Sequence, residues 1–243
     1  MVPSADLAGS RCVVVDVLRA TTTIVAALAA GARAVVPCLS IEDARRLAAS
    51  LPPGSVILGG ERGGLPIAGF DLGNSPAEYT AAVVGGKTVV LTTTNGTQAL
   101  LHCRAAAEIL IGAFVNLSAL CARLAGDAAQ GTVDVVCAGT ESHVTRDDVL
   151  LAGAEAARLA SNQGWQLDDQ AVLARDSWLA VSGAAAGGAL AAQVASALRE
   201  SLGGRNLIQL GMGDDLAWSA DVDRFAIVPR FDAHTKRIDA LVQ

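Results

Sequence analysis

The sequence predicts an α/β fold in which a predominantly parallel sheet is covered by helices. Up to Gly164, short runs of β-branched residues alternate with helical stretches rich in alanine and leucine, as in repeated strand–helix units. The strand runs lack polar alternation, which is typical of a sheet buried on both faces. With 243 residues, 52% of them hydrophobic, the chain is long enough to bury a sizeable core in one large domain.

This alternation assigns most of the chain to individual elements. The expected strands are Cys12–Val17, Ala34–Cys38, Val56–Gly59, Thr88–Thr92, Glu108–Ile111, Thr132–Cys137 and Phe225–Pro229. The expected helices are Thr21–Ala30, Ile41–Leu51, one that begins at Ser75, Thr97–Arg104, Leu117–Ala129 and one from Arg146 to about Asn162. The helix at Ser75 is predicted because a capping serine, a proline at the first helical position and a glutamate three residues after the cap form a capping box.

Beyond Gly164 the sequence becomes alanine-rich and helical. Asp168–Leu202 is predicted to be helical with a break at Ser182–Gly188. No linker, repeat or low-complexity tail separates this part from the rest. We therefore expect residues 1–243 to form one α/β domain, with this alanine-rich helical C-terminal segment, residues 165–220, as a helical cap or subdomain.

The charge of the chain limits its partners. A net charge of −6 without a basic stripe excludes nucleic-acid binding. An acidic chain that handles an anion must build a local positive field from arginines, helix N-termini or a metal ion. No signal peptide and no run of about 18 apolar residues is present, so we expect a cytoplasmic protein with no membrane partner. The five cysteines include no CxxC pair, and we expect buried free thiols.

Polar residues gather at the carboxyl ends of the expected strands, where ligands bind in open α/β sheets. Asp16 and Arg19 follow the first strand, together with Thr21, Thr22 and Thr23. A carboxylate at the end of a buried strand is costly unless it is paired or binds a metal. Asp16 is therefore either a salt-bridge partner of Arg19 or a Mg²⁺ ligand that leaves Arg19 free to bind an anion.

The segment Thr92–Thr97 leads from a buried strand through hydroxyl side chains and an Asn-Gly turn into a helix. Free backbone N–H groups at a helix start, with nearby hydroxyls, bind anions. The alternative is an ordinary N-cap and turn, but three threonines exceed what one cap needs. The predicted substrate-binding residues are Thr22, Arg62, Thr93, Thr94, Asn95, Gly96 and Thr97.

Two further loops carry charged residues. In Gly59–Gly64, Glu61 is a second candidate metal ligand and Arg62 a second anion clamp, with a flexible surface loop as the alternative. Asp147 and Asp148 stand at the start of a helix, and for Asp147 we favour stabilisation of the helix dipole. Asp148 is open between that role and catalysis. His143 is either an acid–base group or a solvated loop residue.

Several of these blocks together resemble the 2-phosphosulfolactate phosphatases of the ComB family. The matching blocks are Asp16–Thr23, Gly60–Gly64, Gly69–Pro76, Thr92–Thr97, Cys137–Thr140 and Asp147–Asp148. The resemblance implies a ComB-like α/β fold and Mg²⁺-dependent hydrolysis of 2-phospho-3-sulfolactate to 3-sulfolactate and phosphate. In methanogens this step belongs to coenzyme M biosynthesis. Where the family usually has a glycine and a more basic loop, this chain has Glu141-Ser142-His143.

The residues and the resemblance lead to one functional hypothesis with two alternatives. We expect Mg²⁺ held by Asp16 and Glu61, with Asp16, Arg19 and Asp148 as catalytic residues and either direct attack by water or a covalent intermediate on Asp16. The alternatives are a phosphatase for another small phosphorylated hydroxy acid and a non-catalytic anion-binding sensor. The partner is a small anionic phosphorylated substrate, and we further expect a homo-oligomer.

Overall fold

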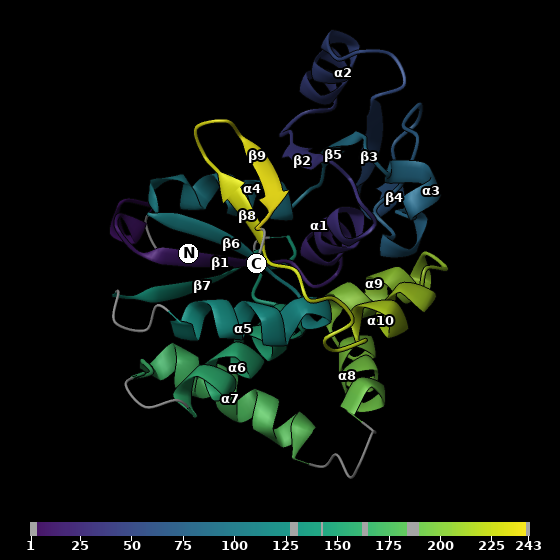
Figure 1. The fold of residues 1–243 in the computed structure, drawn as a ribbon. Helices are drawn as coiled ribbons and strands as arrows, with labels where there is room; N and C mark the ends of the chain where they lie inside the picture. Colours follow the sequence, from purple (N-terminus) through teal and green to yellow (C-terminus); the bar gives the residue numbers. More distant parts are fainter. Residues whose placement is uncertain (1–3, 127–130, 142, 162–164, 184–189, 242–243) are drawn as a thin grey trace.

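A nine-stranded sheet forms the centre of the computed structural model, which describes residues 4–126, 131–141, 143–161, 165–183 and 190–241 (Figure 1). Its order is β4-β3-β5-β2-β9-β8-β6-β1-β7. The strands are β1 (Arg11–Val15), β2 (Ala34–Pro37), β3 (Val56–Arg62), β4 (Leu65–Pro66), β5 (Thr88–Thr92), β6 (Glu108–Gly112), β7 (Val133–Cys137), β8 (Pro229–Asp232) and β9 (Arg237–Ala240).

The sheet consists of two parallel groups joined by an antiparallel hairpin. β3, β5 and β2 are parallel to one another, and so are β6, β1 and β7. The hairpin β8–β9 lies between them and pairs antiparallel with β6 on one side and with β2 on the other. The predicted α/β class is therefore confirmed. The sheet is mixed because of this hairpin and of β4, which pairs antiparallel with β3 at the edge of the sheet.

Helices cover both faces of the sheet (Figure 1). They are α1 (Ala20–Ala29), α2 (Ile41–Ser50), α3 (Ala81–Val84), α4 (Gly96–His102), α5 (Leu117–Gly126), α6 (Arg146–Ala160), α7 (Asp169–Ser182), α8 (Leu190–Arg199), α9 (Leu202–Gln209) and α10 (Asp214–Ser219). Short 3₁₀ helices are η1 (Ser4–Leu7), η2 (Pro76–Glu78), η3 (Cys103–Ala105) and η4 (Phe114–Asn116). None of the helices described is both long and apolar enough to cross a membrane.

Alternate residues of β1 point into two separate cores. Val14 packs on one face in a cluster that contains Ile24 of α1 and Leu100 of α4. Val15 packs on the opposite face with residues of α5 and α6, including Leu151. Since both faces are apolar, the lack of polar alternation in the strand runs has its predicted cause. α7 lies outside α6 as a further layer (Figure 1).

The last predicted strand is wrong in its position. Residues 225–228 belong to no strand: the N–H of Phe225 donates to Val115 O at 2.7 Å, and Asn116 Nδ2 donates to Ile227 O at 3.1 Å. The strand begins only at Pro229 and is followed by β9, which the sequence analysis did not predict. The apolar residues of this segment pack against the loop after β6. Burial alone does not indicate that a segment pairs with another strand.

The helix predicted to begin at Ser75 is also wrong. Only the three-residue 3₁₀ turn η2 forms there, and Ser75 makes no side-chain capping bond. Glu78 does not complete a capping box because its carboxylate accepts from Gly73 N at 2.6 Å. The Ser75 hydroxyl is therefore available for a contact outside its own segment.

The C-terminal helices agree with the prediction up to Arg199. α7 ends at Ser182 as expected, while the predicted break falls mainly on residues outside the described part. Leu202 begins α9 and does not end a helix, because the Ser201 hydroxyl accepts from Gly204 N at 2.9 Å as an N-cap. The cysteines are free: Cys12 is buried, and Cys38 and Cys137 are partly buried.

One carboxyl group lies within the core. Glu155 of α6 is fully buried, and neither of its carboxyl oxygens has a hydrogen-bond partner among the described residues. Gly112 leaves it room, since a Cβ there would lie 2.7 Å from Glu155 Oε1. Burial raises the pKa of Glu155 to about 8, so the side chain is mostly protonated at neutral pH.

Replacing Glu155 with Gln should remove a pH dependence of stability. Between the ordinary pKa of 4.5 and about 8, the folded chain keeps a proton that the unfolded chain has released. The free energy of unfolding of the wild type therefore falls as pH rises through this range, by about 1 kcal/mol per unit. Denaturant unfolding from pH 5 to 8 should show this slope reduced in Glu155→Gln and unchanged in the exposed control Glu42→Gln. Equal slopes in both variants would contradict the burial of a protonated Glu155.

Candidate active site

A cavity of about 340 Å³ opens at the carboxyl ends of the parallel strands, against one side of α9. The segments after four strands and one helix contribute to it, as predicted for the polar residues that follow the strands. The strands do not form one parallel rim, because β1 and β7 run in the direction opposite to β3 and β5. Its lining residues are Asp16, Leu18 and Arg19 after β1, Glu61, Gly63, Gly64 and Asn74 in and after β3, Thr94 and Asn95 after β5, Thr140 and Glu141 after β7, and Gly203, Asn206, Leu207, Gln209 and Leu210 in and after α9.

Asp16 lies where β1 turns into α1. Its side chain is buried, with 7% of the residue exposed, and Oδ1 accepts from Ala20 N at 3.1 Å. Burial, followed by the negative charges of Asp147 and Glu61, raises the pKa of Asp16 to about 7. The salt bridge to Arg19 that the sequence left open does not form, because Arg19 pairs with Asp215.

Asp147 and Asp148 stand in the first turn of α6 and are both buried. Asp148 accepts from Val17 N at 2.9 Å and from Gly139 N at 2.8 Å, so it ties the loop after β1 to the loop after β7. Burial and the charges of Asp147 and Asp16 raise the pKa of Asp148 well above its ordinary value. Asp147 lies in the first turn of the helix, as the predicted dipole role requires, and its buried Oδ1 has no hydrogen-bond partner among the described residues.

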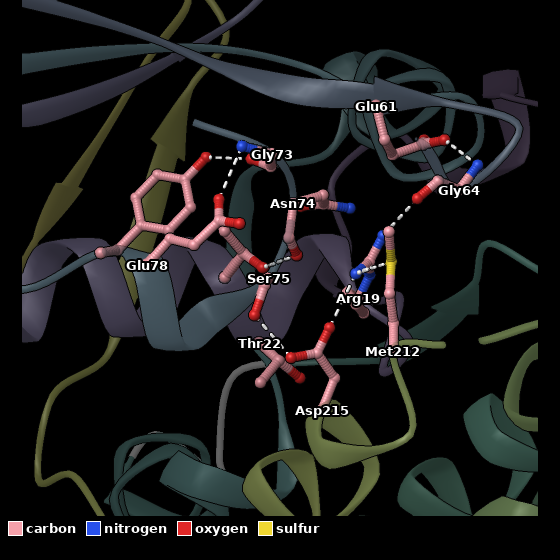
Figure 2. Close-up of polar contacts among 12 residues, drawn as sticks. Arg19, Thr22, Glu61, Gly64, Gly73, Asn74, Ser75, Glu78, Met212 and Asp215 are labelled. Atoms are coloured by element: carbon pink, nitrogen blue, oxygen red, sulfur yellow. Dashed lines mark hydrogen bonds and ion pairs between the residues drawn. The ribbon is translucent and has the colours of Figure 1, made fainter. Parts of the chain in front are cut away.

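Glu61 connects two loops from inside the cavity. Its Oε1 accepts from Thr94 N at 2.7 Å, and its Oε2 accepts from Gly64 N at 2.8 Å. Figure 2 shows the carboxylate turned toward Gly64. Glu61 therefore holds the turn after β3 against the turn after β5, and it also lines the cavity.

Arg19 is enclosed on one side by the C-terminal helices (Figure 2). Its Nη1 lies 2.7 Å from Asp215 Oδ2 and 3.1 Å from Met212 Sδ, and its Nη2 donates to Gly64 O at 2.8 Å. The Arg19 side chain is 3% exposed, and the residue lines the cavity. The ion pair with Asp215 offsets the cost of burying the guanidinium.

Other predicted substrate-binding residues point elsewhere. Arg62 donates to Leu39 O at 2.9 Å and to Thr92 Oγ1 at 2.7 Å, and it does not line the cavity. Thr22 donates to Val17 O at 2.8 Å inside the β1–α1 turn. His143 is exposed and lies outside the cavity.

In the segment after β5, some residues stabilise the start of α4 and others line the cavity. Thr93 and Thr97 bond to each other, with 3.1 Å between their hydroxyls, and Thr97 N in the first turn of α4 donates to Thr93 Oγ1 at 3.2 Å. Thr94 and Asn95 line the cavity. Gly96 permits a close approach: a Cβ there would lie 2.6 Å from Ala20 Cβ and 2.8 Å from Asp16 Oδ2.

Sequence reasoning missed three groups of residues around the cavity. Asn74 lines it and is buried, with no partner for Oδ1 among the described residues. In Figure 2 its side chain extends toward the side on which Arg19 and Glu61 lie. Asn74 lies in Gly69–Pro76, one of the segments that match the family. Neither Asp215 nor the residues of α9 that line the cavity belong to a segment that the sequence analysis singled out for the site.

The cavity residues fit a divalent cation. In the described part of the chain, no group of three or more histidine, cysteine, aspartate or glutamate side chains is placed to hold a metal ion. Mg²⁺ does not need one, because it binds one or two protein carboxylates together with substrate phosphate oxygens and water. Asp16 and Glu61 both line the cavity, and the negative charge of Glu61 is one of the causes that raise the pKa of Asp16. Oxygen donors of this charge suit a hard cation.

The cavity combines carboxylates, which can hold a metal ion, with an arginine, which can bind a phosphoryl group, as in the phosphatase class of hydrolases. A family model described as 2-phosphosulpholactate phosphatase matches residues 2–234. The chain belongs to this family and is a phosphoric monoester hydrolase. The non-catalytic sensor is therefore set aside.

Two of the relatives are similar over nearly the whole chain, and a third over 60% of it. A protein of Symbiobacterium thermophilum named probable 2-phosphosulfolactate phosphatase is 39% identical over 230 residues, which is 94% of each chain. A protein of Parasynechococcus marenigrum with the same name is 40% identical over 230 residues, 93% of this chain and 90% of its own. A third, from Caldicellulosiruptor saccharolyticus, is 45% identical over 150 residues, 60% of this chain and 61% of its own.

Replacing Gly96 with Ala should reduce phosphatase activity at least about tenfold, because the added Cβ forces α4 away from Asp16 and Ala20. The free energy of unfolding should fall by about 1–3 kcal/mol. Phosphate release and thermal unfolding measure the two effects. Gly126→Ala is the control, since nothing lies within 4 Å of a Cβ at that position. Wild-type activity in Gly96→Ala would contradict the close approach of α4 to Asp16.

Proposed function

We propose that the protein hydrolyses 2-phospho-3-sulfolactate to 3-sulfolactate and phosphate, with Mg²⁺ as cofactor. One observation carries the proposal: the cavity holds a buried carboxylate, Asp16, that forms no ion pair with a described residue, beside an arginine, Arg19, with N–H groups that no described residue uses. The names of the relatives supply the substrate.

The chain's own residues have separate roles in this reaction. Bound Mg²⁺, held by Asp16 and Glu61, would offset the negative charge of the phosphoryl group. Arg19 donates its remaining N–H groups to phosphoryl oxygens, which stabilises the charge that these oxygens carry during transfer. Thr94 and Asn95 offer further donors at the cavity wall.

Asp16 and Asp148 differ in their position relative to the substrate. Asp16 faces the cavity, where its carboxylate either orients the attacking water or attacks phosphorus itself. Asp148 does not line the cavity, and we assign it the role of holding the loops after β1 and β7 through Val17 N and Gly139 N. In this proposal Asp148 acts on the reaction through the position of Asp16.

A second candidate substrate class follows from the rim of the cavity. Glu141 lines the cavity beside the carboxylates Asp16 and Glu61. A third negative side chain disfavours a substrate that carries strong negative charge besides its phosphate, as 2-phospho-3-sulfolactate does. Another small phosphorylated hydroxy acid with less charge is therefore the alternative substrate. Three further predictions come from the sequence and the resemblance alone: a cytoplasmic location, a homo-oligomer and a role in coenzyme M biosynthesis.

A substrate panel tests which acid the cavity prefers. Phosphate release should be measured with 2-phospho-3-sulfolactate, 2-phospholactate, 2-phosphoglycerate and 3-phosphoglycerate under the same conditions. We expect the highest kcat/KM for 2-phospho-3-sulfolactate, by at least about tenfold, which is the discrimination that one well-placed polar contact gives. A higher kcat/KM for an acid without the sulfonate would replace the proposed substrate by the alternative.

Removal of the metal or of its principal ligand should abolish turnover. EDTA is expected to stop phosphate release and added Mg²⁺ to restore it, while Asp16→Asn lowers kcat by about 10²- to 10³-fold and weakens Mg²⁺ binding measured by calorimetry. Asp169→Asn removes one exposed negative charge and is the control. Full turnover in EDTA would contradict the cofactor, and wild-type Mg²⁺ affinity in Asp16→Asn would contradict the ligand assignment.

A further inference from the structure

Arg19 is the one cationic side chain among the described residues that line the cavity. Its usefulness to an anion depends on the direction of its planar guanidinium, because arginine recognises phosphate through N–H groups in a fixed fork. A long side chain with many rotamers must be held before it can act in this way. The contacts of Arg19 therefore decide what the cavity can bind.

Three of the five guanidinium N–H groups are already used. Both N–H groups of Nη1 face the C-terminal helices, one on Asp215 Oδ2 at 2.7 Å and one on Met212 Sδ at 3.1 Å. One N–H of Nη2 donates to Gly64 O at 2.8 Å. Nε and the second N–H of Nη2 have no hydrogen-bond partner in the described part of the chain, so they are available to a ligand.

Asp215 is itself fixed in position. It lies in the first turn of α10, is 5% exposed, and accepts from the Ser75 hydroxyl through Oδ1 at 2.5 Å (Figure 2). Ser75 is available for this bond because it does not cap a helix. Each carboxylate oxygen of Asp215 therefore has one partner, Ser75 on one side and Arg19 on the other.

We propose that Asp215 is a positioning residue for the reaction: by binding Nη1 of Arg19, it turns Nε and the free N–H of Nη2 toward the phosphoryl group in the cavity. This inference rests on the proposed function of Arg19 as a phosphate ligand. Asp215 also gives Arg19 an anionic partner outside the cavity. Without it, the carboxylates that line the same cavity, such as Asp16 and Glu61, would compete for the guanidinium that the substrate needs.

A double-mutant cycle separates positioning from a general effect on the fold. Asp215→Asn should raise the inhibition constant of inorganic phosphate about tenfold and lower kcat/KM for 2-phospho-3-sulfolactate by about 10²-fold. In an Arg19→Gln background, Asp215→Asn should change neither value further, because Asp215 acts through Arg19. The matched control is Asp214→Asn, the exposed neighbour in the same helical turn, which should behave as wild type.

Two results would overturn the inference: wild-type phosphate inhibition in Asp215→Asn, or an equal loss in the wild-type and Arg19→Gln backgrounds. If Asp215→Asn does not fold, Ser75→Ala is used in the same cycle, with an expected change of about threefold that also vanishes without Arg19. Failure of the proposed substrate is recognised separately, since the wild type would then not hydrolyse 2-phospho-3-sulfolactate. Phosphate binding measured by calorimetry still reports on Asp215 in that case.

Discussion

The burial of the Asp16 carboxyl group at the end of β1 is the constraint on which the site depends. The group has a backbone N–H for one oxygen and negative side chains around it, and its pKa rises to about 7. Arg19 follows three residues later but does not neutralise Asp16, because Asp215 holds its guanidinium. A buried carboxylate in this position is stable only with a proton or a cation. This need is the physical basis for proposing a metal ion and an anionic substrate in one cavity.

The fold brings the necessary loops to one cavity and then fixes them by carboxylates. β1 and β7 are parallel to each other, as are β3 and β5, but the two pairs run in opposite directions because three antiparallel pairings of the hairpin β8–β9 lie between them. The segments that follow all four strands nevertheless line one cavity. Glu61 joins the turns after β3 and β5, and Asp148 joins those after β1 and β7. The C-terminal helices complete the site: residues of α9 form one wall of the cavity, and Asp215 of α10 accepts a hydrogen bond from Arg19.

Sequence reasoning predicted what depends on local patterns. β-branched runs without polar alternation indicated the parallel strands and their two buried faces, and the rule for strand ends placed Asp16, Arg19, Glu61, Thr94 and Asn95 at the cavity. It failed where a local pattern is used for a distant contact. Ser75 matches the pattern of a helix cap, but its hydroxyl donates to Asp215. Arg62, the last residue of β3, donates to Leu39 and Thr92 and does not line the cavity. The pairing of Arg19 with Asp215 spans 196 positions, so no local pattern can indicate it.

A crystal structure of the protein with Mg²⁺ and inorganic phosphate is the most direct test of the roles of Asp16 and Arg19. We expect the metal on the Asp16 carboxylate and the phosphate on Nε and Nη2 of Arg19, with Asp215 still bound to Nη1. Phosphate bound outside the cavity, or an Asp16 side chain in contact with neither the metal nor the phosphate, would contradict this arrangement.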